Sequence, residues 1–99
     1  MAASESQIEK QVTTYLKKNG IWPVKMSLTS ENGFPDRLCI GYNNIFFIEL
    51  KAPGKKPRPL QKFIHDKIRQ FGFDVLVIDE KQQIIDYIKT LKNDESKKD

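Results

Sequence analysis

The sequence predicts a small α/β fold whose elements follow the order α-β-β-β-α-β-α. Three segments place apolar residues at helical intervals, and four others are short runs typical of strands. Glycine, proline and asparagine lie between these segments, where they favour turns and loops. A chain of 99 residues is long enough for one modest hydrophobic core. We therefore expect a single domain over residues 1–92 and a polar, disordered tail over residues 93–99.

The first predicted helix carries two acids close to its apolar face. Ser6 and Glu9 have the spacing of a capping box, and Gly20 ends the helical pattern. The apolar face is formed by Ile8, Val12 and Leu16. Glu5 and Glu9 project on or beside this face rather than opposite it. They either favour the positive end of the helix dipole or point toward a site that needs carboxylates.

Three strands are expected next. Residues 21–29 (IWPVKMSLT) predict a strand whose proline favours a sheet edge or a strand start. Residues 37–42 (RLCIGY) and 45–51 (IFFIELK) predict a hairpin. Its turn is expected at Asn43-Asn44, because asparagine tolerates the positive φ that two-residue turns require.

The C-terminal half predicts a loop, a helix, a strand and a final helix. Residues 52–59 (APGKKPRP) are too rich in proline and glycine for regular structure. Residues 73–79 (FDVLVID) are typical of a strand covered on both faces. The apolar face of the helix between them is formed by Leu60, Phe63, Ile64, Ile68 and Phe71, and Gly72 ends it. The last helix is marked by Ile84, Ile85, Ile88 and Leu91.

Composition excludes several classes of protein and favours the cytosol. The apolar runs are far shorter than the ~20 residues that span a bilayer, and the N-terminus has no pattern of a secretory signal. Cys39 is the single cysteine, so neither an intramolecular disulfide nor a cysteine-based zinc site is available. No glycine-rich nucleotide loop or nucleophilic serine arrangement is present. We expect Cys39 to be a small buried hydrophobe in a reducing compartment.

Positive charge is concentrated in one segment of the chain. Residues 51–69 contain seven basic residues and one acid, whereas the net charge of the whole chain is only +4. The rest of the protein is therefore slightly acidic. A local basic window favours a surface that follows a phosphate backbone, with an ordinary solvated loop as the alternative. The candidate DNA contacts are Lys55, Lys56, Arg58 and Lys62.

Charges also gather at the open end of the predicted hairpin. A two-residue turn at Asn43-Asn44 pairs Asp36 with Lys51 and Leu38 with Glu49, so Asp36, Glu49 and Lys51 share one face. Two neighbouring carboxylates repel each other, and a bound divalent cation would remove that cost. The alternative is a surface ion pair with Lys51, worth about 1 kcal/mol or less.

These residues resemble the signature of a nuclease superfamily. Pro35-Asp36 followed by Glu49-Leu50-Lys51 resembles the PD-(D/E)xK pattern, and the predicted order of elements is similar to the core of that superfamily. The segments GFPDRL, FFIELKAPGKKPRPLQ and FGFDVLVID are similar to the VRR-NUC family within it, from about Ser4 to Leu91. The resemblance implies a stand-alone nuclease domain, related to Holliday-junction resolvases, with a mixed sheet flanked by helices.

The resemblance also implies the members of an active site. Asp36, Glu49 and the backbone carbonyl of Leu50 would bind Mg²⁺ or Mn²⁺, and Lys51 would be catalytic. Further members would be Gln61 and one acid of the first helix, either Glu5 or Glu9. From its position one turn after Gln61, His65 is expected to be exposed or partly packed rather than catalytic.

The expected function is metal-dependent hydrolysis of phosphodiester bonds in DNA, with a four-way (Holliday) junction as the favoured substrate. A chain of this size holds one active site, and a C2 homodimer would supply the two cuts that resolve a junction. Flaps, single strands or linear duplex are alternative substrates, and a non-catalytic basic DNA-binding module is the non-enzymatic alternative. Trp22, Phe46 and Phe47 are expected in the core or at subunit contacts.

Overall fold

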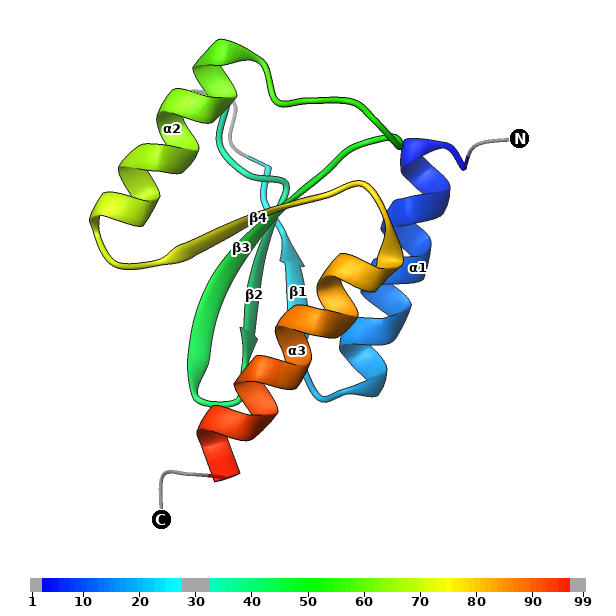
Figure 1. Ribbon diagram of the computed structural model, residues 1–99, viewed down its shortest axis with the longest axis vertical. Coiled ribbons are helices and arrows are strands. Elements are labelled where there is room, and N and C mark those ends of the chain that lie inside the picture. The colour runs from blue at the N-terminus through cyan, green and yellow to red at the C-terminus, as the bar shows by residue number, and fades with distance from the viewer. Residues whose placement is uncertain (1–2, 28–32, 97–99) are drawn as a thin grey trace.

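The computed structural model describes residues 3–27 and 33–96, which contain seven elements in the predicted order (Figure 1). The helices are α1 (Glu5–Lys18), α2 (Pro59–Gln70) and α3 (Lys81–Ser96). The strands are β1 (Trp22–Lys25), β2 (Arg37–Gly41), β3 (Asn44–Leu50) and β4 (Asp74–Ile78). The α-β-β-β-α-β-α order expected from the sequence is confirmed. In the described part of the chain, no helix is long and apolar enough to cross a membrane.

The four strands form one mixed sheet in the order β1-β2-β3-β4. β1, β2 and β3 pair antiparallel, and β3 pairs parallel with β4, so α2 is the crossover between the two parallel strands. β1 lies at the edge of the sheet, which confirms the position expected from its proline.

Helices cover the two faces of the sheet unequally. α1 and α3 pack against each other and against one face, where their apolar residues meet the buried side chains of the strands (Figure 1). This core contains Ile8, Val12, Leu16, Cys39, Phe46, Ile48, Leu50, Ile78, Ile84, Ile88 and Leu91. Side chains alternate along a strand, so Glu49 points away from the face that carries Ile48 and Leu50. α2 packs on that second face, mainly against β4, and reaches β3 through Gln61 and His65, which face Glu49.

Three element boundaries differ from those expected. The N-cap of α1 is Ser4, whose side chain forms a capping box with Gln7, rather than Ser6 with Glu9. β1 ends at Lys25, before residues 28–32, which lie outside the described residues. α3 continues to Ser96, so residues 93–96 of the predicted tail are helical, because buried Leu91 anchors the preceding turn to the core.

The turn of the β2–β3 hairpin lies one residue earlier than predicted. Tyr42 and Asn43 occupy it with φ of 54° and 57°, and Gly41 pairs with Asn44 across the strands. Positive φ at both central residues is typical of a type I′ turn. Tyr42 packs against the core, and a Cβ on Gly41 would come within 2.7 Å of Ile21. Packing of these two residues therefore places the turn at Tyr42-Asn43, one residue before the asparagine pair that predicted it.

The earlier turn changes the partners but not the faces. Leu38 pairs with Phe47 rather than with Glu49, and the same register carried one residue further places Asp36 opposite Glu49 rather than Lys51. A two-residue turn that moves by one position shifts the pairing by two residues, and the faces repeat every two. Asp36 and Glu49 consequently remain on one face and come closer together than predicted.

Glycine substitutions at two adjacent asparagines test this register. Asn43→Gly is expected to stabilise the protein by about 1 kcal/mol or less, because glycine adopts positive φ without a Cβ penalty. Asn44→Gly is expected to destabilise it by about 0.5–1 kcal/mol, because Asn44 is a strand residue. Urea unfolding of the two variants measures both effects. The opposite order of stabilities would place the turn at Asn43-Asn44.

α2 presents its polar side to the sheet and much of its apolar side to solvent. The amphipathic face predicted from Leu60, Phe63 and Phe71 is wrong as a core face, because Phe63 is 63% exposed and Phe71 is 75% exposed. Gln61 and His65 are the buried residues of the helix. The rotation follows from the contact partner, since the side chain that α2 meets on β3 is the carboxylate of Glu49.

Candidate active site

Asp36 and Glu49 lie together at the end of the sheet where β3 stops. Asp36 precedes β2, and its Oδ2 accepts a hydrogen bond of 2.8 Å from the backbone N–H of Leu50. Burial raises the pKa of Asp36, and the neighbouring acids Glu49 and Glu5 raise it further. The hydrogen bond from Leu50 and the charge of Lys51 act in the opposite direction without cancelling the rise.

Glu49 is the most enclosed acid of this site, with 3% of its surface exposed. Its Oε2 accepts a hydrogen bond of 3.2 Å from Gln61 Nε2, and Lys51 Nζ lies 3.5 Å from the same oxygen. Its Oε1 is buried and has no hydrogen-bond partner. A buried carboxylate oxygen is costly without a partner, so this oxygen is suited to bind a cation or to accept a hydrogen bond.

Lys51 and Gln61 form a fixed pair beside these acids. Lys51 Nζ donates to Gln61 Oε1 over 3.0 Å, and the N–H of Arg58 donates to the same oxygen over 2.9 Å. The amide of Gln61 therefore orients two partners at once, with its oxygen toward Lys51 and its nitrogen toward Glu49. Because Gln61 is itself buried in the first turn of α2, the lysine ammonium is held next to the acids.

The two acids of α1 occupy different environments. Glu9 Oε2 lies 3.2 Å from Arg37 Nη2, and Arg37 Nη1 donates to the carbonyl of Pro23 over 2.9 Å. Glu9 is thus engaged in an ion pair on the α1 side of the sheet. Glu5 lies close enough to Asp36 to raise the pKa of that carboxyl. Of the two alternatives left open by the sequence, Glu5 is the acid that the fold brings near Asp36.

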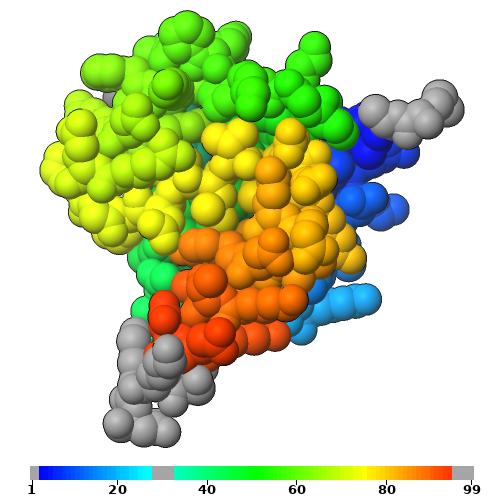
Figure 2. Space-filling model, viewed as in Figure 1, coloured from blue at the N-terminus to red at the C-terminus, as the bar shows by residue number. Residues whose placement is uncertain are grey.

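Three of the predicted DNA contacts lie on the exposed segment between β3 and α2, which Figure 2 shows in bright green along the upper edge of the molecule, and Lys62 lies in the first turn of α2. The N–H of Gly54 donates to Asp79 Oδ2 over 3.1 Å, which ties this loop to the end of β4. A hollow beside it is lined by Gly33, Arg58, Pro59, Leu60 and Gln61. The basic side chains, all exposed, are Lys55, Lys56, Arg58 and Lys62.

The residues at this end of the sheet fit a divalent cation. Asp36 and Glu49 supply carboxylates, and the carbonyl of Leu50 leaves the strand on the same side as its N–H, toward Asp36. Across residues 3–27 and 33–96, no three His, Cys, Asp or Glu side chains converge as a metal-binding group. Two carboxylates with a backbone carbonyl nevertheless suit Mg²⁺, which completes its shell with water and substrate phosphate oxygens.

Comparison with known proteins places the chain in a family. No family model matches the chain. A protein of Acyrthosiphon pisum secondary endosymbiont phage 1, described as "Putative nuclease p44", is 37% identical over 76 residues, which are 76% of this chain and 82% of the phage protein. A solved structure described as "VRR_NUC domain" superposes with a TM-score of 0.77 at 27% identity, over 88% of this chain and 97% of that chain. The chain belongs to the VRR-NUC family. The resemblance expected from the PD and ELK segments is confirmed.

One residue of this VRR-NUC domain is more deeply buried than the sequence predicted. His65 was expected to be exposed or partly packed, but it is 1% exposed, and its Nε2 lies 3.7 Å from Glu49 Oε1. The expectation assumed that the apolar residues of α2 face inward. The signal that was available is the spacing of four residues from Gln61, which places both side chains on one face of the helix.

The raised pKa of Asp36 predicts a dependence of stability on pH in the metal-free VRR-NUC domain. Because its folded-state pKa lies above the ordinary 3.8, the folded protein binds the proton more tightly than the unfolded chain. Stability is therefore lost as the pH rises through the interval between the two values. Asp36→Asn, which stays neutral, is expected to be more stable than the wild type at pH 7.

Urea unfolding in EDTA at a series of pH values measures this difference. The advantage of Asp36→Asn over the wild type is expected to shrink as the pH falls and to be lost well below 3.8, where the wild-type carboxyl is protonated in both the folded and the unfolded state. An Asp36→Asn variant that is less stable than the wild type by the same amount at every pH would contradict the prediction.

Proposed function

We propose that this VRR-NUC domain is an Mg²⁺- or Mn²⁺-dependent endonuclease that hydrolyses phosphodiester bonds in DNA. The observation that carries the proposal is the convergence of Asp36, Glu49, Lys51 and Gln61 at one end of the sheet. Gln61 bonds to both Lys51 and Glu49, and Asp36 accepts from the backbone N–H of Leu50. The homology with a phage protein described as a nuclease supports the same activity and a bacterial cytoplasmic setting.

The cation would be held by Asp36, Glu49 and the carbonyl of Leu50. Bound there, a divalent metal supplies a nucleophilic water of lowered pKa and neutralises charge that develops on the phosphate. The chain prepares the site by placing half-buried Asp36 next to buried Glu49, so that a cation would relieve the repulsion between the two carboxylates. Glu5 would add a further acid from α1.

Lys51 would act on the reacting phosphate or on the attacking water. Gln61 and Glu49 hold its Nζ at the edge of the metal-binding residues, so the ammonium needs no reorganisation when the substrate arrives. A fixed positive charge there stabilises the negative charge of the transition state. The amide of Gln61 would serve as the positioning group that holds the Lys51 ammonium and the Glu49 carboxylate in fixed places relative to each other.

The substrate favoured by the arrangement is branched DNA, with a four-way junction first. The exposed bases Lys55, Lys56, Arg58 and Lys62 lie on the segment that follows Lys51, where they would contact phosphates on either side of the scissile bond. Two symmetric cuts are needed to resolve a junction, and one chain provides one site. We therefore propose a C2 homodimer as the acting form.

An exposed apolar stripe supports the dimer. It runs across the four strands of the sheet and consists of Trp22 of β1, Ile40 of β2, Ile45 of β3 and Phe73, which directly precedes β4. Trp22 pairs with Ile40 and Ile40 with Ile45, while Phe73 precedes β4 at the level of Ile45. Trp22 is 66% exposed, so it does not belong to the core, and a subunit contact is the remaining alternative of the two that were expected. An exposed apolar surface of this kind marks an interaction site.

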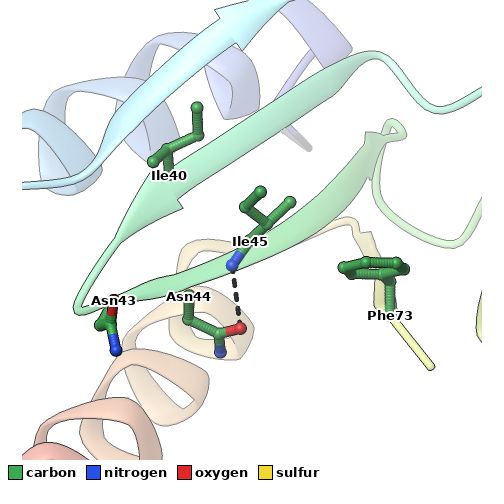
Figure 3. A pocket seen from close by; sticks show the side chains of 5 residues that line it. All are labelled: Ile40, Asn43, Asn44, Ile45 and Phe73. Atoms are coloured by element: carbon green, nitrogen blue, oxygen red, sulfur yellow. Dashed lines mark hydrogen bonds between the residues drawn. The ribbon is translucent and has the colours of Figure 1, made fainter.

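The stripe lies at the opposite end of the sheet from the active site. Figure 3 shows Ile40 and Ile45 on neighbouring strands, with the ring of Phe73 beside them. Ile45 and Glu49 are four strand residues apart, or about 13 Å. A second copy seated on the stripe would thus leave both active sites open to DNA. Phe63 and Phe71 of α2, which are also exposed, would widen the contact.

A cleavage panel tests the function. Purified protein with Mg²⁺ or Mn²⁺ is expected to cut a synthetic four-way junction by paired, symmetric nicks, faster than a flap, a single strand or a linear duplex at equal concentration. Faster cutting of one of the other substrates would overturn the junction as the preferred substrate, but it would still support the nuclease activity. Binding of junction DNA without cutting in either metal would instead support a non-catalytic DNA-binding module.

A further inference from the structure

Helix α2 contacts both oxygens of the Glu49 carboxylate from two positions one helical turn apart. Gln61 Nε2 donates to Oε2 over 3.2 Å, and His65 Nε2 faces Oε1 at 3.7 Å. The spacing of four residues directs the two side chains to the same side of the helix. Leu60, Phe63 and Phe71 are exposed instead, while Ile64 and Ile68 are partly buried. This orientation of the helix brings two polar side chains to one acid.

The second of these contacts is incomplete. Glu49 Oε1 and His65 Nε2 are both buried without a hydrogen-bond partner, and only one other buried side-chain atom of the described residues, Arg37 Nε, shares that condition. The gap of 3.7 Å exceeds the length of a hydrogen bond. Buried polar atoms are nearly always paired, so a free donor and a free acceptor that face each other require an explanation.

We propose that His65 is a positioning residue, which holds the Glu49 carboxylate for the divalent cation by donating a hydrogen bond from Nε2 to Oε1. The inference rests on the proposed function, because it assumes that Glu49 binds the metal. With 1% of its surface exposed, His65 does not reach the substrate, so it is not a catalytic residue. Carboxylates that bind metals are themselves commonly held by hydrogen bonds from neighbouring side chains.

A purely structural role for His65 makes a different prediction. A histidine that served only packing would stabilise the metal-free fold, and its loss would lower stability without changing metal affinity. His65 Nε2 and Glu49 Oε1 are instead both without a hydrogen-bond partner. His65→Leu therefore removes one unpaired buried polar atom and breaks no hydrogen bond between the two, so we expect little loss of stability.

The test uses the full chain and Mn²⁺ alone as the probe, without DNA. Isothermal titration calorimetry gives the Mn²⁺ dissociation constant, and thermal unfolding in EDTA gives the stability of the metal-free protein. His65→Leu is expected to weaken Mn²⁺ binding by about 10- to 100-fold, while its unfolding temperature in EDTA stays close to that of the wild type. His65→Gln, whose amide nitrogen can take the place of Nε2, is expected to restore most of the affinity.

Asparagine provides a matched comparison with glutamine, because it carries the same amide on a chain shorter by one methylene. His65→Asn is expected to bind Mn²⁺ more weakly than His65→Gln at similar stability, which keeps the test decisive even where His65→Leu does not fold. Asp66→Asn, an exposed change on the same helix, is the control and should leave the affinity unchanged.

Two outcomes overturn the proposal in distinguishable ways. Wild-type Mn²⁺ affinity in His65→Leu and His65→Asn, together with loss of affinity in Asp36→Asn, would reject the role of His65 and keep the metal site. Wild-type affinity in Asp36→Asn as well would reject the metal site itself, and with it the proposed function. Lowered unfolding temperature in EDTA with unchanged affinity would assign His65 to packing.

Discussion

Lys51→Met is expected to slow DNA cleavage by about 10²- to 10³-fold, the effect of removing one fixed charge from a transition state. Methionine keeps much of the lysine stem but removes the ammonium that lies 3.0 Å from Gln61 and 3.5 Å from Glu49. DNA binding should largely remain, because the exposed loop supplies the other phosphate contacts. Single-turnover cleavage and junction binding, measured on the same preparation, separate the two effects.

Lys55→Met is the matched control for this variant. Lys55 is exposed on the loop, so its loss should weaken junction binding and reduce the dependence of binding on salt, with little change in the single-turnover rate at saturating protein. A Lys51→Met variant that cuts at the wild-type rate, or that loses cutting only as far as it loses binding, would remove Lys51 from the chemistry.

Ile45→Lys is expected to convert the proposed dimer to a monomer at micromolar concentration. Ile45 lies in the middle of the apolar stripe, and a C2 interface contains each residue twice, so two charges would enter the contact. We expect the dimer dissociation constant to rise by about 100-fold or more, which corresponds to ~3 kcal/mol. Sedimentation equilibrium measures the change directly.

The same variant should change the pattern of cutting. A monomeric variant is expected to leave single nicks in a junction, in contrast to the paired nicks expected of the wild type, while the proposed metal site about 13 Å away along β3 stays unchanged. Gln82→Lys, an equal change of charge on exposed α3, should leave both mass and pattern as in the wild type. Wild-type protein that sediments as a monomer at micromolar concentration would overturn the dimer.

The order of the elements could be predicted from the sequence because each element carries its own local signal. Helical periodicity identified the α1 core face from Ile8, Val12 and Leu16, and all three are buried. The hairpin and its two-residue turn followed from the strand-like runs. The exact turn was wrong, because Tyr42 and Gly41 are placed by contacts with the core and with Ile21, which no local pattern contains.

The candidate site was predictable in part for a related reason. Strand alternation places Asp36, Glu49 and Lys51 on one face of the sheet. Because faces repeat every two residues and the pairing moved by two, this placement did not change when the turn moved. The orientation of α2 was not predictable from periodicity, because that method assumes that the apolar side of a helix faces inward. Here the inward side of α2 carries Gln61 and His65, which face the Glu49 carboxylate. The choice between Glu5 and Glu9 likewise could not be made from local pattern, because Glu9 pairs with Arg37, a residue of another element.

The most direct test of the metal site is the anomalous scattering of a crystal soaked in Mn²⁺. We expect one peak per chain, between the carboxylates of Asp36 and Glu49 and close to the carbonyl of Leu50, and the loss of this peak in Asp36→Asn. A protein that cuts DNA with Mn²⁺ but shows its peak elsewhere, or shows none at these residues, would contradict the proposed metal site.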